Sequence, residues 1–213
     1  MIRMNHFFKR FGDVTLFDDT NLLLPDNGIH FIYGANGTGK ITLFKCLTGN
    51  ENYSGQILIE PRHSMYCVFD DNPFYEKMNT YQNITLLVGR HFKKKTIEAY
   101  ANYMFENLKI LLKPLSDLSL GQRKLISLVL LQCMKPKFIL LDEIFNGMDI
   151  ESRQKAIRAI RDLSQDSLIL LSGHEKLYVQ ISNDCVAIEN QTIVSKDPQY
   201  LLTKFDSLIE ETL

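Results

Sequence analysis

Long hydrophobic runs are missing from this sequence of 213 residues. No uninterrupted apolar stretch approaches the ~18 residues that a helix needs to cross a bilayer. The first residues also lack the pattern of a secretory signal peptide. If the protein acts at a membrane, we therefore expect another chain to span it.

A surplus of either charge is missing as well. The 24 Lys and Arg residues and the 25 Asp and Glu residues leave a formal charge of −1. Because no broad positive field is expected, the composition does not predict a nucleic-acid partner. Any attraction to an anionic surface would have to be local.

Closely spaced cysteines are also absent. The four cysteines are scattered through the chain and form no Cys-x-x-Cys motif. They are Cys46, Cys67, Cys133 and Cys185. This pattern favours reduced, mostly buried thiols in a cytosolic protein.

The composition that remains fits one globular unit. The sequence is 45% hydrophobic and 23% charged, which is typical of a soluble globular protein rather than a disordered one. Its length allows one substantial core but is too short for two full-sized domains. Neither repeats nor long low-complexity linkers divide the chain. We expect a single domain over residues 1–213, built of lobes.

Three short apolar runs predict the centre of the fold. They cover residues 29–33, 138–141 and 168–171. Near-continuous apolar runs of this length suit strands that are buried on both faces of a parallel sheet. Each run is followed at once by small, acidic or imidazole-bearing residues. Since ligands bind at the carboxyl ends of strands in open α/β sheets, we expect one site assembled from three distant segments.

Helices are expected around these strands. Between residues 150 and 163, apolar positions recur at helical spacing with basic residues between them, which predicts an amphipathic helix. The stretch from about Asn72 to Met134 has long helical segments, such as 96–112 and 122–134. We interpret it as a helical lobe inserted between strands.

The first apolar run leads into a glycine-rich segment, GANGTGKIT, at residues 34–42. Glycines let successive backbone N–H groups turn inward around phosphates, and the N-terminus of the following helix adds a favourable dipole. Lys40 can reach the β- and γ-phosphates of a nucleotide. Only Ile41 departs from a phosphate-binding loop, because Ser or Thr there would supply a hydroxyl to Mg²⁺. A glycine-rich turn with a solvated lysine is the simpler alternative.

Two acidic residues, Asp142 and Glu143, end the second run. A carboxylate at the tip of a buried strand, opposite a phosphate loop, can bind Mg²⁺ directly or through water. The next carboxylate can orient and deprotonate an attacking water. Taken alone, the pair could also be two acids that simply face solvent. Taken together with the glycine-rich loop, the pair favours a catalytic site.

A third segment, LSLGQRK at residues 118–124, is expected to open a helix. Ser119 with Gln122 three residues on has the form of a capping box, which needs no ligand. The segment also resembles the signature sequence of ATP-binding cassette (ABC) proteins, Leu-Ser-Gly-Gly-Gln followed by basic residues. Its place after the loop and shortly before Asp142 suits that family.

The resemblance covers nearly the whole chain, from about Met4 to Val194, and implies the fold. An ABC protein is an α/β protein: a P-loop NTPase with a RecA-like, mostly parallel sheet core, an N-terminal antiparallel β region and an inserted helical lobe. The core lobe would comprise about residues 1–70 and 135–213, and the helical lobe about residues 71–134.

The resemblance also implies the catalytic and metal-binding residues. Glu143 would be the catalytic carboxylate, and His174 matches the histidine that contacts the γ-phosphate. Asp142 would hold Mg²⁺ together with Asp70.

The ATP-binding residues implied by the resemblance form a longer set. Phe11 resembles the aromatic that stacks on adenine, and Asp149 matches the aspartate that communicates across a dimer. The full set is Phe11, Gly34, Asn36, Gly37, Thr38, Gly39, Lys40, Ile41, Thr42, Ser119, Gly121, Gln122 and Asp149.

Three positions depart from the family pattern. Ile41 lacks the metal-binding hydroxyl, for which a water could substitute at some loss of rigidity. Asp70 stands where the family usually has a glutamine that touches Mg²⁺ and senses the membrane subunit, and an acid there can still approach the metal. Leu120 replaces the first glycine of the signature but leaves Ser119 and the amide of Gly121 available.

An ABC protein of this type would bind and hydrolyse ATP with Mg²⁺ to power a transporter. Two copies, or this chain and a related second ATPase subunit, would close around ATP at the cytoplasmic face of the membrane and move an integral membrane subunit. The segments 73–75 and 81–84 are similar to subunits of bacterial peptide or multidrug exporters, which favours export. Nucleic acid is not an expected partner.

Two alternatives differ in class. A cassette that binds ATP but hydrolyses it weakly would act as a regulatory or structural switch, and Ile41 is the feature that favours it. A non-transport cassette working on DNA or ribosomes is disfavoured, because the sequence has no coiled-coil insertion, no second cassette and no basic surplus.

Overall fold

A computed structural model describes residues 1–60, 65–69, 74–89 and 92–210, with side chains up to Ser207. Its strands are β1 (Ile2–Phe11), β2 (Val14–Leu24), β3 (Gly28–Tyr33), β4 (Ser54–Ile59), β5 (Met65–Val68), β6 (Phe138–Asp142), β7 (Leu168–Ser172), β8 (Asp184–Glu189) and β9 (Thr192–Lys196). Its α-helices are α1 (Lys40–Leu47), α2 (Thr80–Val88), α3 (Lys94–Phe105), α4 (Leu120–Met134), α5 (Ile150–Ser164), α6 (Lys176–Ile181) and α7 (Pro198–Glu210). Two 3₁₀ helices, η1 (Leu108–Leu112) and η2 (Leu115–Asp117), precede α4.

A six-stranded sheet forms the centre of the molecule, in the order β5-β6-β7-β3-β8-β9. All neighbouring pairs are parallel except β8 and β9. The three predicted apolar runs are the adjacent strands β6, β7 and β3, so segments far apart in the sequence end side by side. The prediction of a mostly parallel α/β sheet is confirmed.

The central strands are buried on both faces, and their side chains alternate between two cores. In β6, Ile139 and Leu141 pack in the core formed with α4 and α5. Phe138 and Leu140 pack in the other core, with α1 and the antiparallel sheet. This period of two explains why the run is continuously apolar: neither face meets water.

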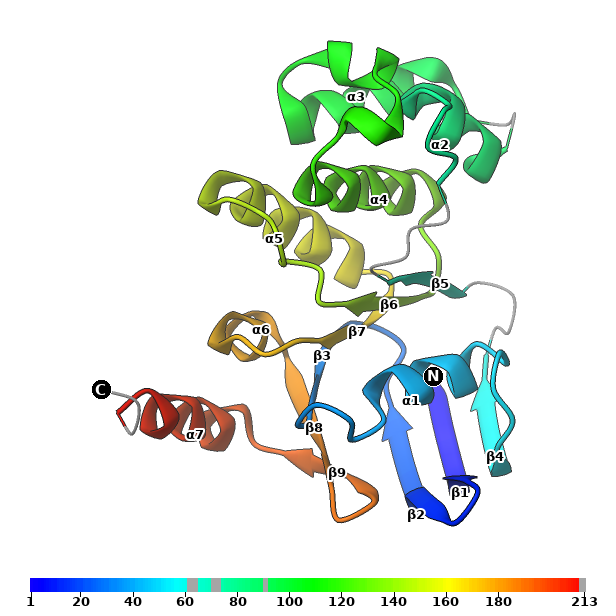
Figure 1. Cartoon of the computed structure of the whole chain (residues 1–213), viewed down its shortest axis with the longest axis vertical. Helices are drawn as coiled ribbons and strands as arrows, with labels where there is room; N and C mark the ends of the chain where they lie inside the picture. Colours follow the sequence, from blue (N-terminus) through cyan, green and yellow to red (C-terminus); the bar gives the residue numbers. More distant parts are fainter. Residues whose placement is uncertain (61–64, 70–73, 90–91, 211–213) are drawn as a thin grey trace.

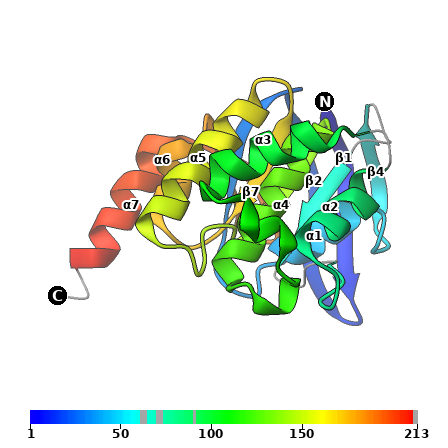
Figure 2. The ribbon, with the colours of Figure 1, turned by 90° about the horizontal axis from the view of Figure 1, so that it is seen from above.

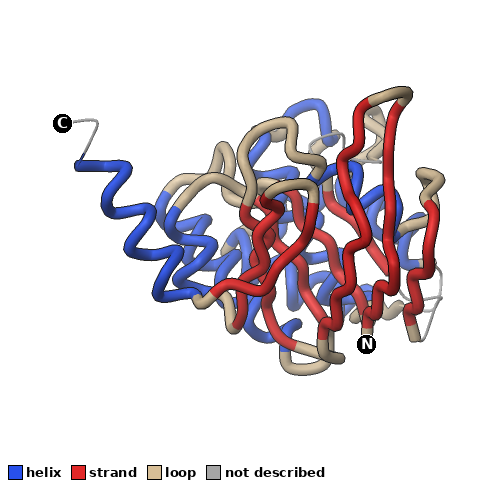
Figure 3. Tube along the Cα trace, turned by 90° about the horizontal axis from the view of Figure 1, so that it is seen from below, coloured by secondary structure: helices blue, strands red, loops and turns tan. Residues whose placement is uncertain are grey.

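The antiparallel sheet has the order β2-β1-β4 and covers one face of the central sheet together with α1. It matches the antiparallel β region expected at the N-terminus. On the other side, α2 and α3 lie over α4 (Figures 1 and 2). The last helix, α7, extends away from the strands toward the C-terminus (Figures 1 and 3).

Two of the three predicted helical segments are confirmed, as α4 and α5. The prediction of one helix over residues 96–112 is wrong. Glu106 adopts a left-handed φ of 56° that ends α3, and the side chain of Asn107 accepts a hydrogen bond from the Lys109 amide to start η1. Asn competes with helical hydrogen bonding in this way, which helical spacing alone does not reveal.

The cysteines are free thiols, as expected, and three of the four are buried. Burial raises the pKa of Cys46 to about 11 and that of Cys67 to about 12. The thiols therefore stay protonated and poorly nucleophilic at neutral pH. Across the described residues, no helix combines the length and the apolar character that a membrane crossing requires.

Candidate functional site

A cleft of about 220 Å³ opens at the carboxyl ends of β3 and β6. It is lined by Leu16, Asn36, Gly37, Gly39, Lys40, Ile41, Thr42, Asp142, Glu143 and His174. The glycine-rich loop, the acidic pair and the histidine thus meet in one place, as the strand order predicts. The cleft is smaller than the roughly 300–1,000 Å³ of pockets that enclose a drug-sized ligand, so a nucleotide held here would keep part of its surface uncovered.

The start of α1 is open toward this cleft. Gly39 is the N-cap residue with a φ of 104°, and α1 has neither a side-chain cap nor an acidic residue in its first turn. A Cβ at Gly39 would also lie 3.0 Å from Cζ of Phe17, so both conformation and space require glycine. The first N–H groups of a helix have no intrahelical partner, and here they are left for an anion.

Lys40 already lies inside the loop. Its side chain is only 8% exposed, and Nζ donates to the carbonyls of Gly34 at 2.6 Å and Ala35 at 3.1 Å. Burial lowers the pKa of Lys40, while the nearby carboxylates Asp142 and Glu143 act in the opposite direction. A bound phosphate would give the ammonium a charged acceptor in place of two neutral ones.

Ile41 follows with 49% of its surface exposed at the cleft. A large apolar side chain is thus solvent-exposed beside two carboxylates. Among the described lining residues, Thr42 carries the one aliphatic hydroxyl. The residue after Lys40 therefore contributes shape but no metal ligand.

The backbone of the acidic pair is fixed from two sides. Asp142, at the end of β6, accepts a hydrogen bond from Ser172 Oγ of β7. Glu143 adopts a left-handed φ of 46°, and its amide donates to the carbonyl of Ser172 at 3.0 Å. Its own carbonyl accepts a hydrogen bond from Nζ of Lys124 in α4 at 2.7 Å. Such a φ is unfavourable for a residue other than glycine and needs support of this kind.

The carboxylate of Glu143 reaches across the cleft. Nδ2 of Asn146 donates to its Oε2 at 2.5 Å, and Nε2 of His174 lies 3.3 Å from its Oε1. In α6, which follows the histidine, the hydroxyl of Tyr178 accepts from the Phe145 amide at 3.3 Å. The loops after β6 and β7 are therefore joined by several contacts, which place an acid and an imidazole side by side.

The signature segment is folded as its capping-box pattern predicts. Ser119 Oγ accepts from the Gln122 amide at 3.2 Å, and Gln122 Oε1 accepts from the Ser119 amide at 3.1 Å. Gly121 packs so closely that a Cβ there would lie 2.5 Å from the Gly147 carbonyl oxygen. None of these residues is among those that line the cleft of this chain.

Five other expected residues do not line the cleft or lie outside the described residues, and two of them, Gly34 and Thr38, belong to the glycine-rich loop itself. Asp149 caps α5 by accepting from the Ser152 amide at 2.7 Å, which lowers the pKa of Asp149. Phe11 is exposed at the end of β1, with Nζ of Lys9 4.2 Å from the centre of its ring. Asp70 lies outside the residues that the structure describes.

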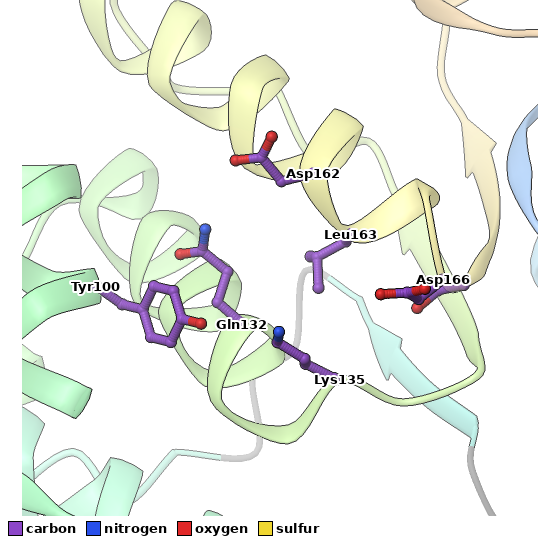
Figure 4. A pocket seen from close by; sticks show the side chains of 7 residues that line it. Tyr100, Gln132, Lys135, Asp162, Leu163 and Asp166 are labelled. Carbon is purple, nitrogen blue, oxygen red and sulfur yellow. The ribbon is translucent and has the colours of Figure 1, made fainter.

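A second cavity, of about 160 Å³, lies between α3, α4 and α5 (Figure 4). Its lining residues are Tyr100, Gln132, Lys135, Asp162, Leu163, Asp166 and Ser167. Because Ser167 directly precedes β7, the cavity lies at the amino ends of the parallel strands, away from the phosphate loop. It contains none of the expected site residues, so the first cleft is the candidate site.

Comparison with known proteins agrees with this geometry. The family model described as ABC transporter matches residues 17–146, more than half of the chain. The chain belongs to the ABC transporter family. Its similarity to curated ABC proteins runs over nearly its full length, and their names describe ATP-binding proteins of transporters.

The relatives named here differ in substrate. The lantibiotic transport ATP-binding protein SrtF of Streptococcus pyogenes is 25% identical over 211 residues, which cover 92% of this chain and 91% of that protein. The sulfate/thiosulfate import ATP-binding protein CysA of Synechocystis is 27% identical, over 90% of this chain and 59% of that protein. Among solved structures, cbiO1 of Clostridium perfringens, part of the ABC transporter complex cbiONQ, aligns with a TM-score of 0.80 and 19% identity, covering 98% of this chain and 93% of that one. That likeness supports the ABC ATPase fold.

Some residues at the candidate site were not expected from the sequence. Leu16 lines the cleft, Ser172 binds Asp142, and Asn146 binds Glu143. Ser172 and Asn146 could have been identified from the sequence, because each closely follows a predicted strand. The burial of Lys124 could not, since a lysine near the start of a helix is ordinarily expected in solvent.

Proposed function

We propose that this ABC protein hydrolyses ATP to drive transport by a membrane partner. The observation that carries the proposal is the convergence of Lys40, Glu143 and His174 on one cleft at the open N-terminus of α1. These are the groups that phosphoryl transfer to water needs: a cradle for phosphates, a base and a donor to the transferred group.

Glu143 would act as the general base. Its carboxylate takes a proton from a water whose oxygen attacks the γ-phosphorus. The bond from that phosphorus to the oxygen bridging the β- and γ-phosphates breaks, and ADP leaves with the electron pair. His174 donates to the γ-phosphate, and Lys40 balances the negative charge on the phosphates.

The carboxylates at the cleft are suited to binding Mg²⁺ together with the phosphates of a nucleotide. Within the described part of the chain, no group of three or more His, Cys, Asp or Glu is placed to hold a metal. Mg²⁺ is commonly bound through one or two carboxylates, substrate phosphates and waters, so a protein cage is not needed. Asp142 would hold the ion, with Asp70 as the second expected ligand. Bound there, Mg²⁺ would neutralise phosphate charge.

The position of the signature residues supports a site shared between two chains. Ser119 and Gly121 are not among the residues that line the cleft with Lys40, and that cleft has a volume of only about 220 Å³. A second copy, or a related ATPase subunit, would bring its own Ser119 over the exposed phosphates in a head-to-tail dimer. ATP would then stabilise the closed dimer, and hydrolysis would open it.

The membrane partner would contact the helical lobe, about residues 71–134. Closure of the dimer would move this lobe against the core, about residues 1–70 and 135–213, and so move the transport helices. The chain would act at the cytoplasmic face of the membrane through that partner.

We propose export as the direction of transport, from the resemblance of residues 73–75 and 81–84 to exporter subunits. The relatives include proteins named for import of sulfate and of methionine, so direction needs its own test. ATP-dependent accumulation of substrate in inside-out vesicles would support export, and accumulation in right-side-out vesicles would overturn it.

A weakly hydrolysing switch is the second candidate function. Ile41 favours it, because this exposed apolar side chain replaces a hydroxyl beside the carboxylates. The purified wild-type chain distinguishes the two functions. A switch would bind ATP but release phosphate no faster than a variant without its catalytic base.

Glu143→Gln tests the proposed reaction. Loss of a general base should lower phosphate release by about 10²–10⁴-fold, while ATP still binds. Glu151→Gln is the matched control, because Glu151 is an exposed acid on α5 that pairs with Lys155. Phosphate release by Glu143→Gln at the wild-type rate would contradict the assignment.

A further inference from the structure

Lys124 is an unusual residue at this site. It is fully buried in α4, where a lysine is rare because its ammonium loses its hydration. Its Nζ donates a hydrogen bond of 2.7 Å to the main-chain carbonyl of Glu143. The buried cation is therefore directed at the backbone of the proposed catalytic base.

The backbone of Glu143 needs such a contact. Its φ of 46° lies in the left-handed region, which a residue with a Cβ adopts at a cost in free energy. On its amide side, the residue is held by the Ser172 carbonyl at 3.0 Å. On its carbonyl side, Lys124 is the holding group. One contact comes from the sheet and the other from the signature helix.

We propose that Lys124 is a positioning residue for ATP hydrolysis. By fixing the carbonyl of Glu143, it keeps that residue in its left-handed conformation and aims the carboxylate into the cleft, next to His174. The proposal rests on the proposed function of Glu143. Lys124 itself is not among the residues that line the cleft.

The position of Lys124 also connects two sites. The helix that carries it begins with Ser119 and Gly121, which in the proposed dimer contact ATP held by the other chain. Gly121 packs directly on the carbonyl of Gly147, in the loop that follows Glu143. If α4 shifts when the second chain engages, the contact of Lys124 with the Glu143 carbonyl would carry that shift to Glu143.

Lys124→Met tests the proposal, because methionine keeps an unbranched apolar side chain and removes the ammonium. We expect kcat for ATP hydrolysis to fall about 10–100-fold, the scale of a small misplacement of a catalytic group. The Kd for ATP measured without Mg²⁺ should change less than about twofold. Val129→Ala is the control, since Val129 is fully buried in the same helix, more than one turn after Lys124, and its loss perturbs packing without removing an ammonium.

A double variant separates positioning from general damage. In a Glu143→Gln background, Lys124→Met should cause no further loss of turnover, because its effect passes through Glu143. An equal loss in both backgrounds, an unchanged kcat in Lys124→Met, or an equal loss of kcat in Val129→Ala would each overturn the proposal. If Glu143→Gln alone leaves turnover unchanged, the proposed function fails first.

Lys124→Gln covers the case in which Lys124→Met does not fold. Glutamine keeps an N–H donor on a shorter side chain and should retain a kcat between those of wild type and Glu143→Gln. A kcat equal to that of wild type would show that the reach of the lysine is not needed and would contradict the role.

Discussion

Two helices of this molecule begin at glycine-containing motifs, and their first turns are prepared in opposite ways. α1 follows Gly39 and has no side-chain cap. α4 follows Ser119 and has a complete capping box with Gln122. Since the first N–H groups of a helix need partners, those of α1 are left to a ligand, whereas those of α4 are partly satisfied within the chain. The N-terminus of α1 therefore has free N–H groups with which a single chain can bind an anion. The N-terminus of α4 is already stabilised by its capping box when no ligand is bound.

Ser119→Ala is predicted to have the largest effect, because it alters the first turn of α4. It removes the cap of α4, which should cost about 1 kcal/mol of stability. Loss of a hydrogen bond to a charged phosphate, worth about 1.5–3 kcal/mol, should weaken ATP-dependent dimerisation by tenfold or more. ATP affinity of the monomer should be unchanged. Sedimentation velocity across an ATP titration would measure both species.

The control for that variant is Ser116→Ala, because the hydrogen bond that the Ser116 hydroxyl makes among the described residues goes to its neighbour Asp117. It should dimerise as wild type does. A Ser119→Ala chain that binds ATP weakly as a monomer, with dimerisation otherwise intact, would place Ser119 at the cleft of its own chain and remove the distinction between the two helices.

Ile41→Ser tests the first turn of α1. A hydroxyl after Lys40 would add an oxygen ligand for Mg²⁺, so affinity for Mg²⁺-ATP should rise about fivefold, which corresponds to ~1 kcal/mol, and turnover should rise with it. Titrations with and without Mg²⁺ would isolate the metal-dependent part. Ile41→Ala, which removes the exposed side chain without adding oxygen, should not show this gain. Equal activity of Ile41→Ser and wild type would mean that water or another carboxylate already serves the ion.

The smallest effect is predicted in β3, the strand that leads to α1. Burial lowers the pKa of His30, although Asn27 and Asp184 act in the opposite direction. The unfolded chain therefore binds this proton more readily, and the free energy of unfolding should fall as the pH drops below about 6.5, by less than ~1.4 kcal/mol per pH unit. Urea unfolding between pH 7 and 5 would measure this slope. His30→Gln should reduce this dependence of the unfolding free energy on pH. An identical slope in the variant would show that other groups cause the loss of stability in acid.

Much of the fold followed from continuous apolar runs. Strands β3, β6 and β7 are buried on both faces, so they leave no polar face and are visible in the sequence. The positions of the glycine-rich loop and of Asp142 and Glu143, each directly after an apolar run, predicted where the cleft would lie. The order of the strands could not be predicted from local pattern, because it depends on how distant segments pack.

The structure was less predictable at positions whose role depends on backbone conformation or on burial. Helical spacing suggested one helix over 96–112, but Glu106 and Asn107 break it. Lys124 gave no signal, since nothing in its neighbours shows that it will be buried against a carbonyl. The catalytic, ATP-binding and metal-binding roles expected of the site residues stay predictions. Phe11 does not line the cleft, and Asp70 is outside the described residues.

In the proposed dimer, one ATP site is completed by two chains. The molecular mass of Glu143→Gln in solution, measured by light scattering with and without ATP, tests this sharing. We predict a monomer without nucleotide, a dimer with ATP, and a monomer again with ATP when Ser119→Arg is added. A chain that binds ATP tightly yet stays monomeric at every concentration of nucleotide would contradict a shared site.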